Sequence, residues 1–284
     1  MRFWPFFFPR RQRMYALLMA VSISVHIVSS VAAPITFNTA LPIGQHEVII
    51  GKQLTFSGVS GSGKGIDTVT AQTLAAYGLT AKWAILGATP VVYRNASSNS
   101  GAIDTFRQGD SIVFSRYEMF RFDGRGSTTR IAPLLGINLP TSHGSEEASF
   151  FGGLVTTIAN TDFNFGTQFL YTEQHRNQDR EIGGTTAFDA SIQYRVWPGE
   201  MSTETSGFLF AVLETNMTHQ RRAHSVESNE PNTTETQWSI SPGMQYVTQR
   251  WILDLALTIP VNRATTINAV EPEYRVLSGI RINF

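Results

Sequence analysis

Three features of the 284-residue sequence predict an all-β fold, a transmembrane antiparallel up-and-down β-barrel of about 12 strands. The first is the last segment, residues 272–284, where apolar and polar residues alternate up to a terminal aromatic, Phe284. The second is the alternation of short and long connections between strand-like runs. The third is composition, because 15% of the residues are charged, against about 25% in soluble proteins.

The N-terminal residues have the features of an export leader. Residues 1–13 carry four arginines and no acidic residue, and residues 14–31 are mainly apolar. Because small residues follow, we expect residues 1–33 to be a cleaved signal peptide, cut after either Ala32 or Ala33. A transmembrane anchor is the alternative, although several serines interrupt the apolar run.

The chain after the leader divides into a short lead-in and a barrel. Residues 34–45 contain two prolines, which suit an extended stretch and not a central strand, so we expect a periplasmic lead-in. Residues 46–284 are predicted to form the outer-membrane barrel. Its strands are expected at 46–57, 67–77, 80–93, 109–122, 127–140, 147–159, 163–175, 183–197, 204–218, 234–247, 250–261 and 272–284.

The connections alternate in length along the whole chain, as periplasmic turns and external loops do in outer-membrane barrels. A soluble β-sandwich has no need of that alternation. The short connections are 78–79, 123–126, 160–162, 198–203 and 248–249. The long ones are 58–66, 94–108, 141–146, 176–182, 219–233 and 262–271.

Individual strands have one apolar and one polar face, because side chains alternate across a strand. In residues 187–196, for example, Phe188, Ile192 and Tyr194 oppose Asp189 and Gln193. The pattern is least regular at 67–77, 109–122 and 147–159. Aromatic residues near the strand ends are candidates for the two interfacial girdles of a barrel.

Charged residues in the middle of strands are the candidate functional residues. A charge that faces lipid is costly, by about 2–4 kcal/mol for Arg or Lys at the bilayer midplane, so these side chains are expected to line the lumen. They could surround an aqueous channel, or pair with one another and plug a narrow barrel, and the sequence leaves both open. The predicted lumen-lining residues are Lys82, Arg130, Asp189, Arg195, Glu214, Asp254, Arg275 and Arg281.

Four stretches carry a resemblance to a known family. They are 137–141 (INLPT), 208–216 (FLFAVLETN), 239–261 (SISPGMQYVTQRWILDLALTIPV) and the terminal GIRINF. Together they resemble the outer-membrane family named for the meta-pathway of phenol degradation. The resemblance implies a barrel that passes hydrophobic or aromatic compounds, and it implies no catalytic residues.

Other functions find little support in the sequence. Residues 58–65, GVSGSGKG, nearly match a phosphate-binding P-loop, but Gly65 stands where Ser or Thr is required. Without cysteine there is no thiol chemistry, and a weak metal site at His219 and His224 is the most that the histidines suggest. His143 and Ser145 share a single loop, which does not define a hydrolase.

The predicted function is therefore an outer-membrane channel or transporter for small hydrophobic or aromatic compounds, without catalysis and without a cofactor. A structural or surface-binding barrel with a plugged lumen is the alternative, and a barrel enzyme is a remote second one. The expected partners are outer-membrane lipid, a small hydrophobic solute and the barrel-assembly machinery, which would recognise Phe284 as an insertion signal. Nucleic acid is not expected, because all four arginines of residues 1–13 leave with the leader and the remaining chain is net negative.

Overall fold

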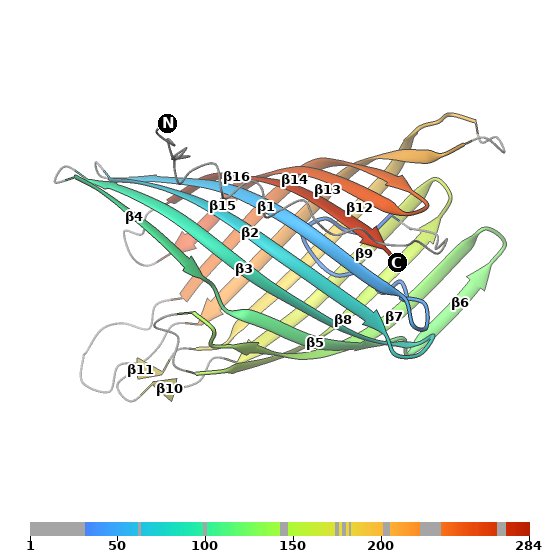
Figure 1. Cartoon of the computed structure of the whole chain (residues 1–284), viewed down its shortest axis with the longest axis horizontal. Helices are drawn as coiled ribbons and strands as arrows, with labels where there is room; N and C mark the ends of the chain where they lie inside the picture. The colour runs from blue at the N-terminus through green and yellow to red at the C-terminus, as the bar shows by residue number, and fades with distance from the viewer. Residues whose placement is uncertain are drawn as a thin grey trace, which may run out of the picture.

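The computed structural model of the chain describes residues 32–61, 64–98, 101–142, 147–173, 176–177, 180–181, 183–200, 205–221, 234–265 and 271–284. These residues form a closed antiparallel barrel of 12 strands, which confirms the predicted fold class (Figure 1). Residues 1–31 of the leader, the P-loop-like residues 62–63, the His143–Ser145 pair and His224 lie outside the described ranges, whereas Ala32 and Ala33 lie within them. Within those ranges, no helix is long and apolar enough to span a membrane.

The strands follow one another around the wall in chain order, and each pairs antiparallel with the next. The sheet closes because β1 pairs with β16 as well as with β2. The wall contains β1 (Val48–Gly61), β2 (Lys64–Gly78), β3 (Trp83–Ser98), β5 (Ser111–Tyr117), β7 (Ser127–Leu139), β8 (Ser149–Asn160), β9 (Phe163–Glu173), β12 (Thr185–Trp197), β13 (Gly207–Arg221), β14 (Thr234–Thr248), β15 (Trp251–Thr265) and β16 (Glu271–Asn283). A separate two-stranded sheet joins β10 (Arg176–Asn177) to β11 (Arg180–Glu181).

The region between the third and fourth predicted strands differs most from the prediction. Residues 94–108 were expected to be a loop, but β3 continues to Ser98 and the chain returns as a further strand, β4 (Gly101–Gln108). The hairpin was not predicted because its residues are mainly polar. Cross-strand pairs stabilise it, among them a 2.6 Å hydrogen bond from Asn95 Nδ2 to Asp104 Oδ1. Among the described strands β4 pairs only with β3. Its other edge is not paired with the described residues of β7, so the sheet is interrupted between β4 and β7.

The other end of the predicted strand 109–122 is also interrupted. After β5 the strand is interrupted at Glu118 and Met119. It resumes as β6 (Phe120–Gly124), which pairs with the first residues of β7. The predicted tight connection at 123–126 is present, with Gly126 at a φ of 72°. Buried Glu118 accepts a hydrogen bond from Arg130 Nη1 at 2.5 Å, which fixes the break against β7.

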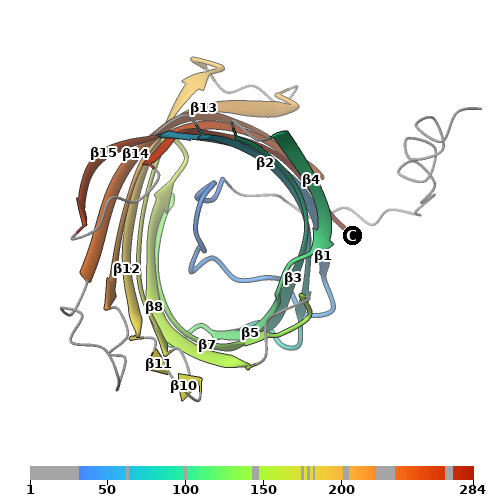
Figure 2. The same ribbon diagram turned by 90° about the vertical axis from the view of Figure 1, so that its left-hand side faces the viewer.

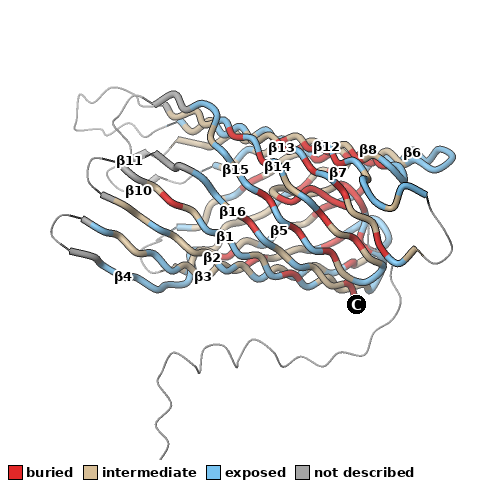
Figure 3. Tube along the Cα trace, turned by 90° about the horizontal axis from the view of Figure 1, so that it is seen from above, coloured by how far each residue is buried: buried red, intermediate tan, exposed pale blue. Residues whose placement is uncertain are grey.

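Buried and exposed residues alternate along the strands of the wall (Figure 3), and many of the exposed ones are large apolar residues. The two faces of the wall therefore have opposite chemistry, and the apolar face is the outer one. In β12, Phe188 is 48% exposed and Ile192 is 47% exposed, whereas Ser191 and Gln193 are buried. A soluble barrel would have the reverse arrangement, because its apolar side chains would fill the core. The predicted alternation in this strand is confirmed, and its apolar stripe lies where lipid would contact it.

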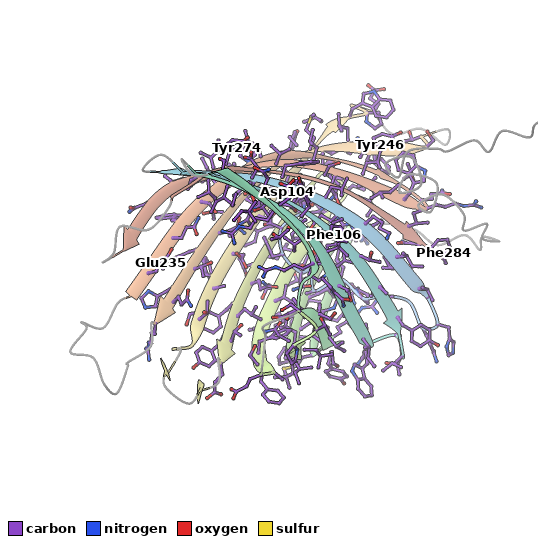
Figure 4. All side chains as sticks on the ribbon, turned by 60° about the vertical axis from the view of Figure 1, so that its left-hand side comes forward. Asp104, Phe106, Glu235, Tyr246, Tyr274 and Phe284 are labelled. Atoms are coloured by element: carbon purple, nitrogen blue, oxygen red, sulfur yellow. The ribbon has the colours of Figure 1, made fainter. Side chains whose placement is uncertain are left out.

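Aromatic side chains mark the two ends of the outer apolar face. Tyr246 packs against Trp251, with ring centroids 5.3 Å apart, near the end where Phe284 closes the chain (Figure 4). Tyr274 lies toward the opposite end of β16. This arrangement is typical of the interfacial girdles of a membrane barrel.

Residues 33–43, which we call the inner segment, run through the interior of the barrel (Figure 2). The expectation that residues 34–45 form a periplasmic lead-in was therefore wrong for most of that stretch. The physical reason is that polar side chains of the inner wall satisfy the backbone groups of the segment. Its apolar side chains are buried too, since Ile35 packs near Phe210 and Ala40 packs near Val155.

Candidate functional site

Two strands anchor the beginning of the inner segment. On β14, Gln245 accepts a hydrogen bond from Ala33 N–H at 3.0 Å, and its Nε2 donates to Ala33 O at 2.8 Å. On β13, the Glu214 carboxylate accepts from Ile35 N–H at 2.7 Å, and from Thr36 N–H at 3.0 Å and Thr36 Oγ1 at 2.6 Å. Both wall side chains are almost fully buried, so these bonds form out of contact with water.

The next strands around the wall hold the rest of the segment. Gln168 of β9 accepts from Asn38 Nδ2 at 2.8 Å, and Thr157 of β8 accepts from Ala40 N–H at 2.9 Å. Beyond them on β5, the Arg116 guanidinium donates to the carbonyl oxygens of residues 39 and 41. The wall residues that bind successive parts of the inner segment therefore lie on β14, β13, β9, β8 and β5 in turn. The segment follows the curve of the wall along these strands.

The buried carboxylates of this region have several hydrogen-bond donors each. Asp189 accepts from Gln168 Nε2 at 3.0 Å and from Asn216 Nδ2 at 2.9 Å. Asp254 accepts from Gln245 Nε2 at 2.7 Å and from Arg281 Nη2 at 3.2 Å. A buried charge is tolerated when it is hydrogen-bonded in this way, so the network can stabilise the inner segment.

The structure distributes the predicted lumen residues over three settings. Asp189, Glu214, Asp254 and Arg281 belong to the network around the inner segment. Arg130 pairs with Glu118 and Asp123, and Arg195 pairs with Asp162, near the short turns at one end of the barrel. Arg275 is exposed on the β16 face that it shares with Arg281, near the opposite end.

Lys82 is the exception among the predicted lumen residues. It lies in the turn between β2 and β3 and is exposed, because β3 begins at Trp83 and not at residue 80. Phe284 follows β16, and its backbone exchanges hydrogen bonds with Val48 of β1, at 2.8 Å and 3.2 Å. The terminal residue therefore takes part in closing the barrel, and its recognition during insertion stays a prediction.

Four of the wall residues that hold the inner segment were not predicted from the sequence: Thr157, Gln168, Gln245 and Arg116. The first three are neutral, and the search for wall charges passed over them. Gln168 nevertheless stands on the polar face of an alternating strand, which is a usable indication. Arg116 belongs to the stretch 109–122, where the alternation is least regular.

A cavity of about 600 Å3 separates the inner segment from the opposite part of the wall. Apolar side chains from β2, β3 and β5 form much of this wall, together with a smaller number of polar groups. The apolar lining residues include Leu74, Leu86, Ala88, Ile112 and Phe114, and the polar ones include Gln53, Gln72, Arg116, Asp254 and Arg281. Cavities of about 300–1,000 Å3 with an apolar lining and a few polar groups are typical of small-molecule sites.

The described residues show no arrangement that suggests catalysis by a metal. In this part of the chain, no three His, Asp or Glu side chains come together in a way that could hold a metal ion. The buried carboxylates instead bind backbone and amide donors of the protein itself.

A closed barrel with an apolar outer face and aromatic ends is the architecture of bacterial outer-membrane proteins. Among solved structures, an outer membrane channel from Pseudomonas putida F1 matches with a TM-score of 0.58 and 13% identity, over 87% of this chain and 97% of that chain. The beta domain of the Bordetella autotransporter BrkA gives 0.46 and 9%, over 84% and 99%. A monoaromatic hydrocarbon channel, CymD, gives 0.37 and 10%, over 86% and 89%, and these last two superpositions are too loose to define a common fold.

No protein-family model and no curated protein matches the sequence. The likeness to the Pseudomonas putida channel therefore concerns the fold, and the chain is an outer-membrane-type barrel of 12 strands.

Proposed function

We propose that this protein is an outer-membrane channel for small hydrophobic or aromatic compounds, which pass through the cavity beside the inner segment. The observation that carries the proposal is the cavity of about 600 Å3 with an apolar wall formed by Leu86, Ala88, Ile112 and Phe114. The Pseudomonas putida protein of similar fold is an outer membrane channel, which supports this proposal.

The inner segment makes a general aqueous pore a poorer alternative. A 12-stranded barrel lies between the filled eight-stranded barrels and the open porins of 16 or more strands. Here residues 33–43 occupy part of the interior, and Arg281 and Asp254, which both border the cavity, form an ion pair with each other. The remaining space is bordered mainly by apolar groups, which favours solutes that lose little on leaving water.

Uptake by whole cells tests the proposal, because apolar solutes cross simple lipid vesicles without a channel. We expect cells that express the protein to take up a labelled monocyclic arene faster than control cells, with no gain for a sugar of similar size. Ala88→Phe should reduce the arene uptake, since the new ring would occupy the cavity. Ala211→Phe is the matched control, because Ala211 is exposed on the outer face of β13.

The same experiment separates the alternatives. Equal uptake by wild type, Ala88→Phe and control cells would contradict the proposal and favour a sealed structural barrel. A gain in sugar uptake as large as the gain for the arene would indicate an aqueous pore instead.

A further inference from the structure

A charged side chain, that of Lys52, stands within the apolar outer face of the barrel. Lys52 of β1 is exposed, and it lies between Ile50 and Leu54, two exposed apolar residues of the same face. Its chain neighbours face inward, since Gln53 donates a hydrogen bond to Ile35 O of the inner segment. A Cβ on Gly51 would likewise meet the side chains of Arg281 and Leu74.

Lys52 also lies near the middle of the apolar belt. Val48, four residues earlier in β1, pairs with Tyr77 at one end of the belt. Phe56, four residues later in β1, lies close to Tyr274 at the other end. A lysine that faces lipid costs most at this depth, so its presence requires a compensating role.

The outer face around Lys52 is polar along one row. Lys52 Nζ donates to Thr73 Oγ1 on β2 at 2.8 Å, and Thr73 pairs with Thr89 of β3. Thr89 Oγ1 lies 3.1 Å from Ser111 Oγ, which lies 3.0 Å from Thr141 Oγ1. We call these five residues the outer polar row.

The row leads to the interruption between β4 and β5. Ser111 is the first residue of β5, and the next residue, Ile112, lines the interior cavity. Among the described residues no carboxylate pairs with Lys52, and the Thr73 hydroxyl accepts only one of the three protons of the ammonium group. The row therefore offers a cation with unused donors on a surface that contacts lipid.

We propose that the outer polar row binds the carboxylate of a single-chain amphiphile of the membrane, such as a long-chain fatty acid, with Lys52 as the anion site. The alkyl chain would lie against the apolar neighbours Ile50 and Leu54. A phosphate head group fits less well, because a phosphodiester stays ionised and remains at the interface. A carboxylic acid can reach the middle of the belt in its neutral form and ionise beside the ammonium group.

This inference rests on the proposed function in one respect: Ser111 of the row directly precedes Ile112, which lines the cavity from the inner face, so anionic amphiphiles would be a substrate class. The binding site itself does not depend on transport. Photo-crosslinking tests it with the full-length protein in phosphatidylcholine vesicles. The probes are a C16 fatty acid with a mid-chain diazirine, its methyl ester, and phosphatidylglycerol that carries the same chain.

We expect the acid to label β1–β3 about tenfold more than its methyl ester does, because only the acid can pair with the ammonium group. Lys52→Met should reduce labelling by the acid to the level of the ester, and Lys52→Arg should preserve it. Lys82→Met is the matched control, since Lys82 lies in an exposed turn. Met suits a lipid-facing position better than Lys, so heat-modifiable mobility should show Lys52→Met fully folded.

Equal labelling by acid and ester, or unchanged labelling of Lys52→Met, would overturn the proposal. Stronger labelling by phosphatidylglycerol than by the acid would assign the row to a lipid head group instead. Arene uptake distinguishes this inference from the proposed function. Wild type that takes up the arene but shows no acid-specific labelling would overturn this inference and leave the arene channel standing. Wild type that shows acid-specific labelling but takes up no arene would overturn the proposed function and leave the amphiphile site standing.

Discussion

The two sides of the barrel interior hold the inner segment very differently. On one side, β8, β9, β13 and β14 each present a buried polar side chain that binds its backbone or side chains. On the other side, β1, β2 and β3 border the cavity, and among their described residues a single long hydrogen bond, 3.4 Å from Gln53 Nε2 to Ile35 O, reaches the segment. This difference in hydrogen bonding indicates that one half of the wall holds the inner segment in place. The other half is left free to contact a solute.

The largest effect is expected from removing the inner segment. Deletion of residues 34–41 should raise single-channel conductance several-fold, because the cavity would merge with the space that the segment occupies. The barrel itself should stay closed, since backbone pairing of β1 with β16 and β2 does not involve these residues. Planar-bilayer recording measures the conductance, and heat-modifiable gel mobility checks the fold.

Unchanged conductance of a folded deletion variant would contradict the idea that the inner segment limits the passage on the cavity side. It would mean that the passage is limited elsewhere, and the cavity beside the segment would then have no part in permeation.

A smaller effect is expected when one anchor on the tightly bonded side is lost. Glu214→Met removes the acceptor of two backbone N–H groups and one hydroxyl, at a cost of about 3–5 kcal/mol to docking of the segment. Hydrogen exchange of residues 35–36 should therefore become faster by two orders of magnitude or more. Leu213→Met on the outer face of the same strand is the matched control.

If exchange in Glu214→Met matched the control, the hydrogen bonds of β13 would not determine the position of the segment. The difference between the two sides would then have to arise from the packing of Ile35 and Ala40.

The wall could be predicted from the sequence because its information is local. Alternation along β12 and β15 and the lengths of the short connections depend on residues close together in the chain. The prediction failed at the β3–β4 hairpin of residues 94–108, although its two strands are close in the sequence. Its pairs, such as Asn95 with Asp104, are polar and resemble loop residues until the partner strand is known.

The site was less predictable, since it depends on contacts between residues far apart in the sequence. Glu214 was identified as a wall charge, but its partners Ile35 and Thr36 are about 180 positions away. Nothing in residues 34–45 alone distinguishes a lead-in outside the barrel from a segment inside it. Lys52 shows the same limit, because its place on the lipid face follows only from the register of β1.

The smallest effect is expected on the cavity side. Gln53→Leu removes the one long hydrogen bond that β1 donates to the inner segment, so docking should weaken by less than about 1 kcal/mol. Exchange of residues 35–36 should then stay within about fivefold of wild type. Arene uptake should be unchanged or faster, because leucine makes this part of the cavity lining more apolar. Exchange as fast as in Glu214→Met would mean that both sides hold the segment equally. In that case the cavity would be a gap within a uniformly bonded plug, and an apolar solute would have to displace the segment before it could pass.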